Sequence, residues 1–189
     1  MPLEENMNSF YSAEELLSFG FKSIGNDVSI SRKCSIYGAA DISIGSHVRI
    51  DDFCLLSGHI EIGNRVHISA YAALYGGGGI TIGNFCGISP RCTLLSASDD
   101  FSGEHMISPM VPPELTYVTR RPIIMEDYTQ LGTGTTVLPG VHILRGAVTG
   151  ACSLVRSDLP EWSVCWGVPC KSRKIRSKKI EELSSLIID

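Results

Sequence analysis

A six-residue repeat in the middle of the chain limits the possible folds more than any other feature of the sequence. Between Ile62 and Leu94 the chain divides into the blocks IGNRVH, ISAYAA, LYGGGGIT, IGNFCG and ISPRCT, and an aliphatic residue opens each block. A period of six is a multiple of the strand period of two and not of the helical period of 3.6, so each block is a short strand whose first residue always faces the same side. Repeats of this kind predict a parallel β-helix, an all-β solenoid.

The repeat covers most of the chain. Its opening positions are Ile24, Ile30, Ile36, Ile44, Ile50, Leu56, Ile62, Ile68, Leu74, Ile82, Ile88, Leu94, Met125, Leu131, Val137, Ile143, Thr149 and Val155. At three strands a turn, these eighteen positions predict about six coils around an aliphatic interior. Two-residue insertions interrupt the period before Ile44 and Ile82. The pairs Gly25-Asn26, Gly63-Asn64 and Gly83-Asn84 mark sharp corners, where we expect both members to tolerate a positive φ.

Four of the seven cysteines fit the repeat. Cys34, Cys54, Cys86 and Cys92 each occupy the fifth place of a block, where other blocks hold Val or Ala. No CxxC pair occurs, so we interpret these thiols as small buried hydrophobes and expect neither disulfides nor zinc ligands.

Non-repeating segments flank the coils. Residues 12–15 (SAEE) form a capping box that predicts a helix running to about Phe19, and Gly20 ends it. From Ser177 onward, Ile180, Leu183 and Ile187 fall on one face of a short amphipathic helix that we expect to pack back on the coils. We therefore divide the chain into an N-terminal helical cap (1–23), a parallel β-helix (24–170) and a basic C-terminal tail and helix (171–189).

The repeat breaks between Leu94 and Ile123, and we place the function there. A compact solenoid has no structural need for a loop of this length, and long loops are usually functional or disordered. The excursion loop of about residues 96–122 gathers three carboxylates and an imidazole, on Asp99, Asp100, Glu104 and His105. The alternative is a solvated arm that only contacts a neighbouring subunit.

A second functional signal lies at the C-terminal end of the repeat. The stretch from Trp162 to Lys171 contains Gly167-Val168-Pro169, which we interpret as a turn that ends the coils. The cations that follow have no acid among them: Lys171, Arg173, Lys174, Arg176, Lys178 and Lys179. Such a run is either a solvated tail or a site for a multiply phosphorylated ligand.

Composition excludes several classes of protein. A net charge of −4 argues against a nucleic-acid partner. The sequence has no apolar run long enough to span a membrane. Its first ten residues include two acidic ones, where a secretory signal has basic residues followed by an apolar run. We therefore expect a cytoplasmic protein without a membrane partner. The histidines lack the close spacing of a three-imidazole zinc site, so we expect no metal.

Several motifs together resemble the hexapeptide-repeat acyltransferases over nearly the whole chain. These are the repeat itself, the loop after Leu94, and the ending Leu138-Pro139-Gly140-Val141, Gly150-Ala151 and 167–171 (GVPCK). The galactoside and maltose acetyltransferase branch is the most similar. Within it, residues 16–37, 50–54 and 96–103 resemble enzymes that acylate dTDP-4-amino-4,6-dideoxyglucose for bacterial surface polysaccharides such as the O-antigen of lipopolysaccharide.

The resemblance implies a left-handed β-helix and a homotrimer with its active sites between subunits. It also implies acetyl-CoA as co-substrate, lying in the groove between adjacent β-helices, and a nucleotide-linked amino sugar as acceptor at the loop. Thr133, Ala151, Lys171 and Lys174 match coenzyme-binding positions of the branch, and Arg156-Ser157 stand where the family often has Thr-Lys. On the acceptor side, Ser69 replaces a common Asn, and Tyr71 lies beside it.

The most informative departure from the branch is at the catalytic position. Five residues after Leu94, where the galactoside branch has its histidine base, this chain has Asp99. A hydroxyl needs a strong, well-placed base to attack a thioester, whereas an amine attacks once it is neutral, so a carboxylate favours N-acylation. His105 is the rival base, because imidazole titrates near neutral pH. O-acetylation of a sugar or small hydroxylated acceptor and a non-enzymatic scaffold are the alternative functions.

Overall fold

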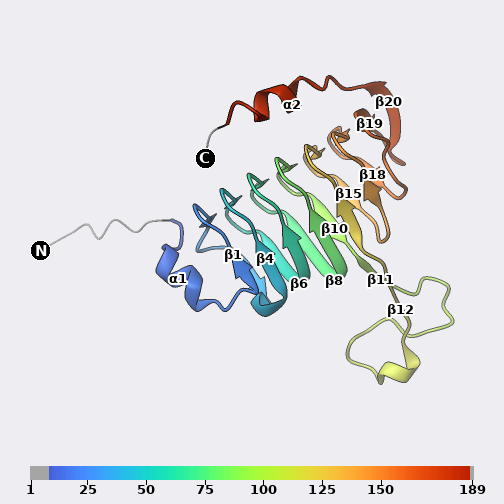
Figure 1. The fold of residues 1–189 in the computed structure, drawn as a ribbon. Helices are drawn as coiled ribbons and strands as arrows, with labels where there is room; N and C mark the ends of the chain where they lie inside the picture. Colours follow the sequence, from blue (N-terminus) through green and yellow to red (C-terminus); the bar gives the residue numbers. More distant parts are fainter. Residues whose placement is uncertain (1–8, 188–189) are drawn as a thin grey trace, which may run out of the picture.

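The computed structural model describes residues 9–187 and shows a parallel β-helix (Figure 1). Short strands stack in three columns, and the chain visits each column once per turn. The first stack contains β1 (Ser23–Ile24), β4 (Ile42–Ile44), the ends of β6 (Leu55–Ile62) and β8 (Ala73–Ile82), β13 (Ile123–Met125) and β16 (His142–Ile143). The predicted fold is therefore confirmed.

The second stack is the longest. It contains β2 (Ser29–Ile30), β5 (Arg49–Ile50), β7 (His67–Ile68), β9 (Gly87–Ile88), β14 (Gln130–Leu131), β17 (Val148–Thr149) and β19 (Ser163–Trp166), followed by the antiparallel β20 (Lys171–Ile175). The third contains β3 (Ser35–Tyr37), the beginnings of β6 and β8, β10 (Thr93–Leu95), β15 (Thr136–Val137) and β18 (Leu154–Val155).

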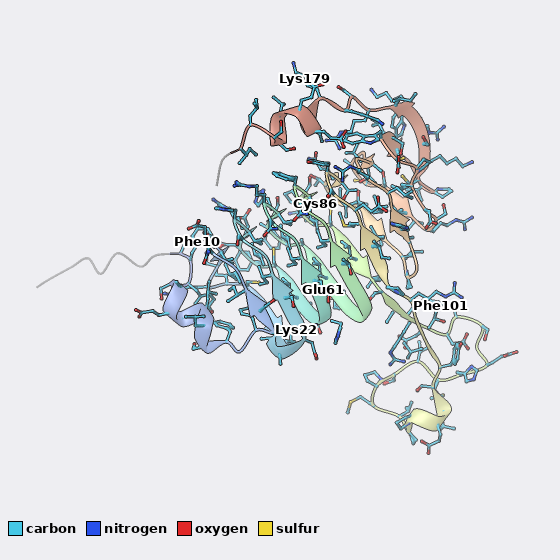
Figure 2. The ribbon with its side chains drawn as sticks, viewed as in Figure 1. Phe10, Lys22, Glu61, Cys86, Phe101 and Lys179 are labelled. Atoms are coloured by element: carbon cyan, nitrogen blue, oxygen red, sulfur yellow. The ribbon has the colours of Figure 1, made fainter. Side chains whose placement is uncertain are left out.

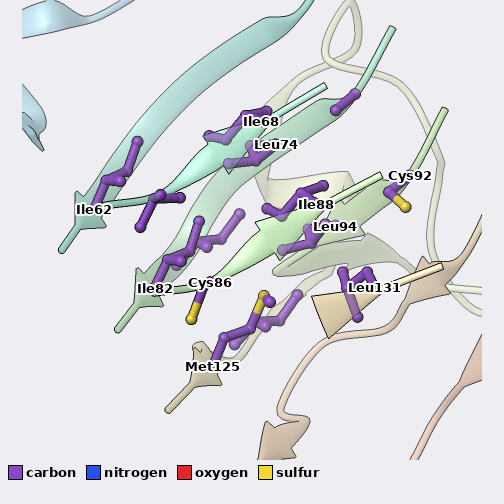
Figure 3. Packing of buried hydrophobic residues seen from close by; sticks show 14 of the residues in the cluster. Ile62, Ile68, Leu74, Ile82, Cys86, Ile88, Cys92, Leu94, Met125 and Leu131 are labelled. Carbon is purple, nitrogen blue, oxygen red and sulfur yellow. The ribbon is translucent and has the colours of Figure 1, made fainter. Parts of the chain in front are cut away.

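The repeat positions meet in register inside the coils. Ile50 pairs with Ile68, and Leu74 pairs with Leu94, so like residues stack on like residues. Figure 3 shows this interior near the middle of the β-helix, with aliphatic side chains from successive turns in contact and the thiol of Cys86 among them. Desolvation raises the pKa of the Cys54 thiol to about 11, which agrees with its interpretation as a small hydrophobe.

The β-helix has about seven turns, one more than predicted. Leu159 and Cys165 lie six residues apart and are buried at 2% and 0% exposure, and they continue the repeat beyond Val155. β19 is a strand of this added turn, and Gly167-Val168-Pro169 lies in the turn that follows it, as predicted. The repeat is hard to recognise in this stretch of sequence because polar and aromatic residues, Trp162, Ser163 and Trp166, surround Cys165.

The corners differ from the prediction in one respect. Positive φ values fall on the residue after each Gly-Asn pair: 57° at Arg65 and 56° at Phe85. The asparagines act through their side chains, because Oδ1 of Asn84 accepts a hydrogen bond of 2.8 Å from the N–H of Asn64 in the turn before. The glycines leave room for that neighbour; a Cβ on Gly63 would lie 2.8 Å from the backbone of Gly83.

Helices lie at both ends of the described chain. α1 (Ala13–Ser18) begins at Ser12 with the predicted capping box, ends at Phe19, and buries Leu16 against the first turn. α2 (Lys179–Ser184) lies beside the corner residue Tyr128, whose hydroxyl is 2.7 Å from that of Ser184, but Leu183 of the predicted apolar face is 51% exposed. A short 3-10 helix, η1 (Ala39–Asp41), precedes β4. In the part of the chain that the structure describes, no helix is long and apolar enough to cross a membrane.

Candidate active site

The excursion loop (residues 96–122) leaves the β-helix without disturbing its stacks. β10 pairs in register with β8 in the turn before and with β15 in the turn after, so the coils continue across the insertion. The two ends of the loop run together as the antiparallel strands β11 (Ala97–Asp99) and β12 (Val118–Arg120), and the 3-10 helix η2 (Pro113–Leu115) lies beyond them. The loop projects clearly from one side of the stack (Figure 1).

Buried Ser96 fixes the base of this loop. Its N–H and hydroxyl both donate to the carbonyl oxygen of Tyr75, at 3.1 and 2.7 Å, and its Oγ accepts a bond of 2.8 Å from the N–H of Gly78. Its own carbonyl accepts a bond of 2.9 Å from the N–H of Arg121. Gly78 cannot carry a side chain here, since a Cβ would collide with that carbonyl oxygen. Asp99 is therefore held in place three residues from a rigid anchor.

A cavity of about 720 Å³ lies between the excursion loop and the third stack, and we call it the loop cavity. Ser57 and Tyr75 line it from two successive coils, and Asp99, Val118 and Arg120 line it from the ribbon of β11 and β12. This volume is typical of small-molecule sites. The loop cavity is the candidate acceptor site.

The carboxylate of Asp99 is exposed on the wall of the loop cavity. Across the described residues, no side chain forms an ion pair or hydrogen bond with it, so the carboxylate can bind a ligand without first breaking an internal contact. An ionised carboxylate accepts hydrogen bonds only, and an amine or ammonium supplies the matching donors. Among the possible donors, an ammonium group also forms an ion pair with the carboxylate, which a neutral hydroxyl cannot do.

Asp100 is engaged within the loop. Its carboxylate accepts bonds from the N–H and hydroxyl of Ser102 at 2.9 and 2.7 Å, and from the N–H and Nδ1 of His105 at 3.1 and 3.3 Å. These donors, first of all the Ser102 N–H, lower the pKa of Asp100 to about 2. Such an anion is too weak a base for proton transfer near neutral pH, and its contacts order the turn.

His105 and Glu104 do not line the loop cavity. The His105 ring packs against Tyr117 with centroids 5.4 Å apart, and its Nδ1 faces Asp100. Glu104 is exposed, and its N–H donates to the Ser102 hydroxyl at 3.2 Å. Of the four predicted catalytic side chains, Asp99 is thus the one that the structure places on the cavity.

Four of the residues predicted to bind coenzyme or acceptor lie along one edge of the β-helix: Ser69, Tyr71, Thr133 and Ala151. This edge, which we call the corner ladder, joins the second and third stacks. A chain of backbone bonds runs along it: Tyr71 N–H to Asp52 at 3.1 Å, Arg91 N–H to Ala70 at 3.2 Å, Gly134 N–H to Pro90 at 3.0 Å, and Cys152 N–H to Thr133 at 2.8 Å. Thr133 and Ala151 therefore occupy equivalent places in successive turns, and Ser69 and Tyr71 flank Ala70, the equivalent residue of an earlier turn.

Large side chains stack on the N-terminal half of the corner ladder. The rings of Phe53 and Tyr71 lie 5.0 Å apart, the Arg91 guanidinium lies 5.8 Å from the Tyr71 ring, and the Lys33 ammonium lies 5.3 Å from Phe53. Phe53, Tyr71 and Arg91 have φ values near +60°, which turn their side chains outward at the corner. The C-terminal half, with Gly134 and Ala151, is bare by comparison and leaves its backbone accessible.

The basic residues of the C-terminal segment lie next to this bare half. Lys171 is the register partner of Trp166, and Lys174 that of Val164, so the predicted tail is an edge strand (β20) and not a solvated coil. Trp166 packs over Gly150, immediately before Ala151. Both lysines are exposed and, among the described residues, have no acidic partner. Two lysine ammonium groups therefore lie beside the exposed segment at Ala151.

Arg156 and Ser157 lie on a different corner. They follow β18 at the junction of the third and first stacks, the corner from which the excursion loop leaves two turns earlier. The third stack separates them from Thr133 and Ala151. The predicted site residues therefore form two groups on two edges of the same chain.

Sequence reasoning missed most of the cavity lining. Tyr75, Val118 and Arg120 are each part of the wall, yet none belongs to a motif. The sequence around Asp99 gives no sign of Val118 or Arg120. These two residues join the cavity wall because β11 pairs with β12, almost twenty residues farther along the chain. In the described part of the chain, no cluster of three metal-ligating side chains occurs.

Comparison with known proteins gives close relatives. No protein-family model matches the chain. A curated dTDP-4-amino-4,6-dideoxy-D-glucose acyltransferase from Escherichia coli is 41% identical over 175 residues, which cover 91% of each chain. A galactoside O-acetyltransferase from Lactococcus lactis subsp. lactis is 33% identical over 98 residues, which cover 43% of this chain and 46% of that one.

Solved structures give the same result. AntD, an N-acyltransferase from Bacillus cereus in complex with dTDP and 3-hydroxybutyryl-CoA, matches with a TM-score of 0.91 and 45% identity, covering 95% of this chain and 96% of AntD. An AntD serine variant in complex with dTDP-4-amino-4,6-dideoxyglucose and coenzyme A matches with a TM-score of 0.92 and 44% identity, covering 95% and 97%.

Proposed function

We propose a specific reaction from the premise that this chain belongs to the family of dTDP-4-amino-4,6-dideoxyglucose acyltransferases. It is an acyl-CoA-dependent acyltransferase, and the reaction is transfer of an acetyl group from acetyl-CoA to the 4-amino group of a nucleotide-linked 4-amino-4,6-dideoxy sugar. The observation that carries the choice of an amine is the unpaired carboxylate of Asp99 on the loop cavity. The AntD complexes, with dTDP-amino sugar or an acyl-CoA bound, support the same pairing of substrates.

Asp99 acts on the attacking amine in this proposal. Its carboxylate binds the sugar ammonium, orients the nitrogen toward the thioester carbonyl and takes or relays the proton that the nitrogen loses. The C–N bond forms as the C–S bond breaks, coenzyme A leaves as the thiol, and the amide remains on the sugar. A carboxylate suffices because the neutral amine is itself a good nucleophile.

Coenzyme A is bound along the corner ladder in this proposal. Thr133 and Ala151 are exposed to an amide-containing chain, and the ammonium groups of Lys171 and Lys174 lie nearby with no acidic partner within residues 9–187. Phosphate groups are the natural ligands of such cations. Arg156 and Ser157, on the neighbouring corner, approach the coenzyme from the other side of the groove, and Ser69 and Tyr71 approach the acceptor.

A homotrimer brings the two groups of residues together. In one chain the third stack separates the loop cavity from the corner ladder, whereas a groove between adjacent β-helices is lined by one edge from each. The excursion loop presents apolar side chains for such a contact, because Phe101 and Met110 are 93% and 89% exposed and Ile107 is 65% exposed. Phe101 lies on the part of the loop that projects from the coils (Figure 2). Apolar side chains at this density mark a protein interface.

The substrates also indicate where the enzyme works. Nucleotide sugars and acyl-CoA carry several charges and do not cross membranes unaided, so an enzyme that joins them works in the cytoplasm. An acylated nucleotide sugar is a donor for glycan assembly, and we assign the product to bacterial surface polysaccharide, such as O-antigen.

A thiol-release assay with acetyl-CoA tests the proposal. The panel contains dTDP- and UDP-linked 4-amino sugars, with the matching 4-hydroxy sugars as controls. We expect thiol release with dTDP-4-amino-4,6-dideoxyglucose and none above background with the hydroxy sugars. Acylation of the hydroxy sugars would indicate an O-acetyltransferase, and no release with any acceptor would indicate a scaffold.

A further inference from the structure

The ribbon of β11 and β12 presents one side chain beside Asp99 that the proposed reaction does not yet use. In the antiparallel register Asp99 lies directly opposite Val118, and both line the loop cavity. Directly opposite side chains in such a pair have Cβ atoms about 4.5–5.5 Å apart. The adjacent pair, Ser98 and Thr119, belongs to the other face of the ribbon and does not line the cavity. The cavity wall thus carries a carboxylate and an isopropyl group side by side.

The wall around Val118 is mainly apolar. Pro109, Val111 and Pro113 line the cavity from the outer part of the loop, and Val118 itself is half-buried. Arg120, two residues along the same strand face, is exposed. The pair of Asp99 and Val118 therefore lies between a charged side and an apolar side of the cavity.

A 4-amino-4,6-dideoxyhexose has the complementary pattern. Its amine is on C4, and its C6 methyl group is attached to the next ring carbon, C5, so a polar donor and a methyl group lie next to each other on one edge of the sugar. One cross-strand pair spaced by roughly 5 Å can contact both groups. A C6 hydroxyl in place of a methyl hydrogen would be buried against the isopropyl group of Val118, which can neither accept nor donate a hydrogen bond.

We infer that Val118 is the residue that selects a 6-deoxy sugar, by packing on the C6 methyl group while Asp99 binds the C4 amine. This inference rests on the proposed function. It assigns Asp99 to the amine of the acceptor and Val118 to the carbon that lacks a hydroxyl. An apolar contact that rejects an added hydroxyl discriminates by about 10- to 100-fold.

The test replaces Val118 by a residue of the same shape with a hydroxyl. For Val118→Thr, kcat/KM is measured with dTDP-4-amino-4,6-dideoxyglucose and with the 6-hydroxy analogue dTDP-4-amino-4-deoxyglucose. We expect the ratio of the two values to fall by about 10-fold relative to the unmodified enzyme. The matched control is Thr119→Val, the reverse exchange on the opposite face of the same strand, and its ratio should stay within about 2-fold.

Two results would overturn the inference. One is an unchanged acceptor ratio in Val118→Thr. The other is a change in the preference for butyryl-CoA over acetyl-CoA with the acceptor ratio constant, which would assign the apolar wall to the acyl chain.

A second variant covers the case in which Val118→Thr does not fold. Val118→Ile narrows the cavity, and we expect it to lower kcat/KM for the 6-hydroxy sugar about 10-fold more than for the 6-deoxy sugar. An equal loss with both sugars would count against Val118. Failure of the proposed function is a separate result, because the unmodified enzyme would then acylate neither amino sugar.

Discussion

Asp99 and Asp100 are adjacent carboxylates with different surroundings. Asp99 has no partner among the described side chains and faces the loop cavity, whereas Asp100 accepts four hydrogen bonds from the turn that follows it. Their order in the sequence does not reveal this difference, because it depends on which of them the ribbon turns toward the coils. The two residues therefore call for separate substitutions.

Replacing Asp99 by Asn tests its part in the reaction. The amide keeps the shape and loses the charge, so we expect kcat/KM for the amino sugar to fall about 10²-fold or more. The loss should shrink as the pH is raised, since solution then supplies the neutral amine. The measurement is a pH profile of kcat/KM for both enzymes. His105→Ala is the comparison and should cost less; a larger loss in His105→Ala, with Asp99→Asn nearly silent, would support the histidine as base.

Asp100 should control the order of the loop in acid. Its pKa is lowered to about 2, below its ordinary value of 3.8, so its contribution to stability is fully present above about pH 4 and disappears as the pH falls toward 2. We expect the amides of Ser102 and His105 to lose protection from hydrogen exchange over that range. The control is Asp100→Asn, in which protection of these amides should no longer depend on pH there.

At the level of elements, β20 turns the basic segment into a strand with defined neighbours. Replacing Lys171 and Lys174 together by Ala should raise the KM for acetyl-CoA with a smaller effect on kcat, because contacts with remote phosphates act equally in the ground and transition states. Lys179→Ala, an exposed lysine of α2, is the matched control and should change neither constant. An unchanged KM in the double variant would remove the coenzyme role of β20.

Local signals predicted some elements well. α1 begins and ends where its capping box and Gly20 indicate, since these contacts lie within a few residues of one another. The last turn was missed because Ser163, Val164 and Trp166 hide the period around Cys165. The corners were misassigned by one residue because the Asn side chain bonds to the preceding turn, and that contact spans twenty residues.

The candidate site was also predictable only in part. The interrupted repeat located the loop, and the spacing from Leu94 located Asp99. Val118 and Tyr75 could not be predicted, because they reach the loop cavity through strand pairing and through the stacking of coils. Asp100 and His105 were indistinguishable from Asp99 by residue type, and only their hydrogen bonds separate them.

At the level of the whole molecule, the site residues on two edges predict an assembly. We expect sedimentation to give a trimer of about 60 kDa from chains of 20.5 kDa. Replacing Phe101 and Met110 by Glu should weaken the trimer and the activity together, since both are exposed on the loop. Leu17→Glu, at an exposed position of α1, is the control. A stable monomer with full activity would contradict a site shared between subunits.

The pairing of β10 with β8 and β15 is uninterrupted, so the β-helix and the excursion loop are structurally separate parts of one chain. The coils keep their register across the insertion, and Ser96 joins the loop to the coils through backbone and hydroxyl bonds at the base of the loop. The tip of the loop can therefore accumulate substitutions, insertions or deletions without cost to the solenoid. With the acceptor assigned to the loop cavity and coenzyme A to the corner ladder, as proposed, new acceptor specificities can evolve at this one corner while the surface for the co-substrate stays the same.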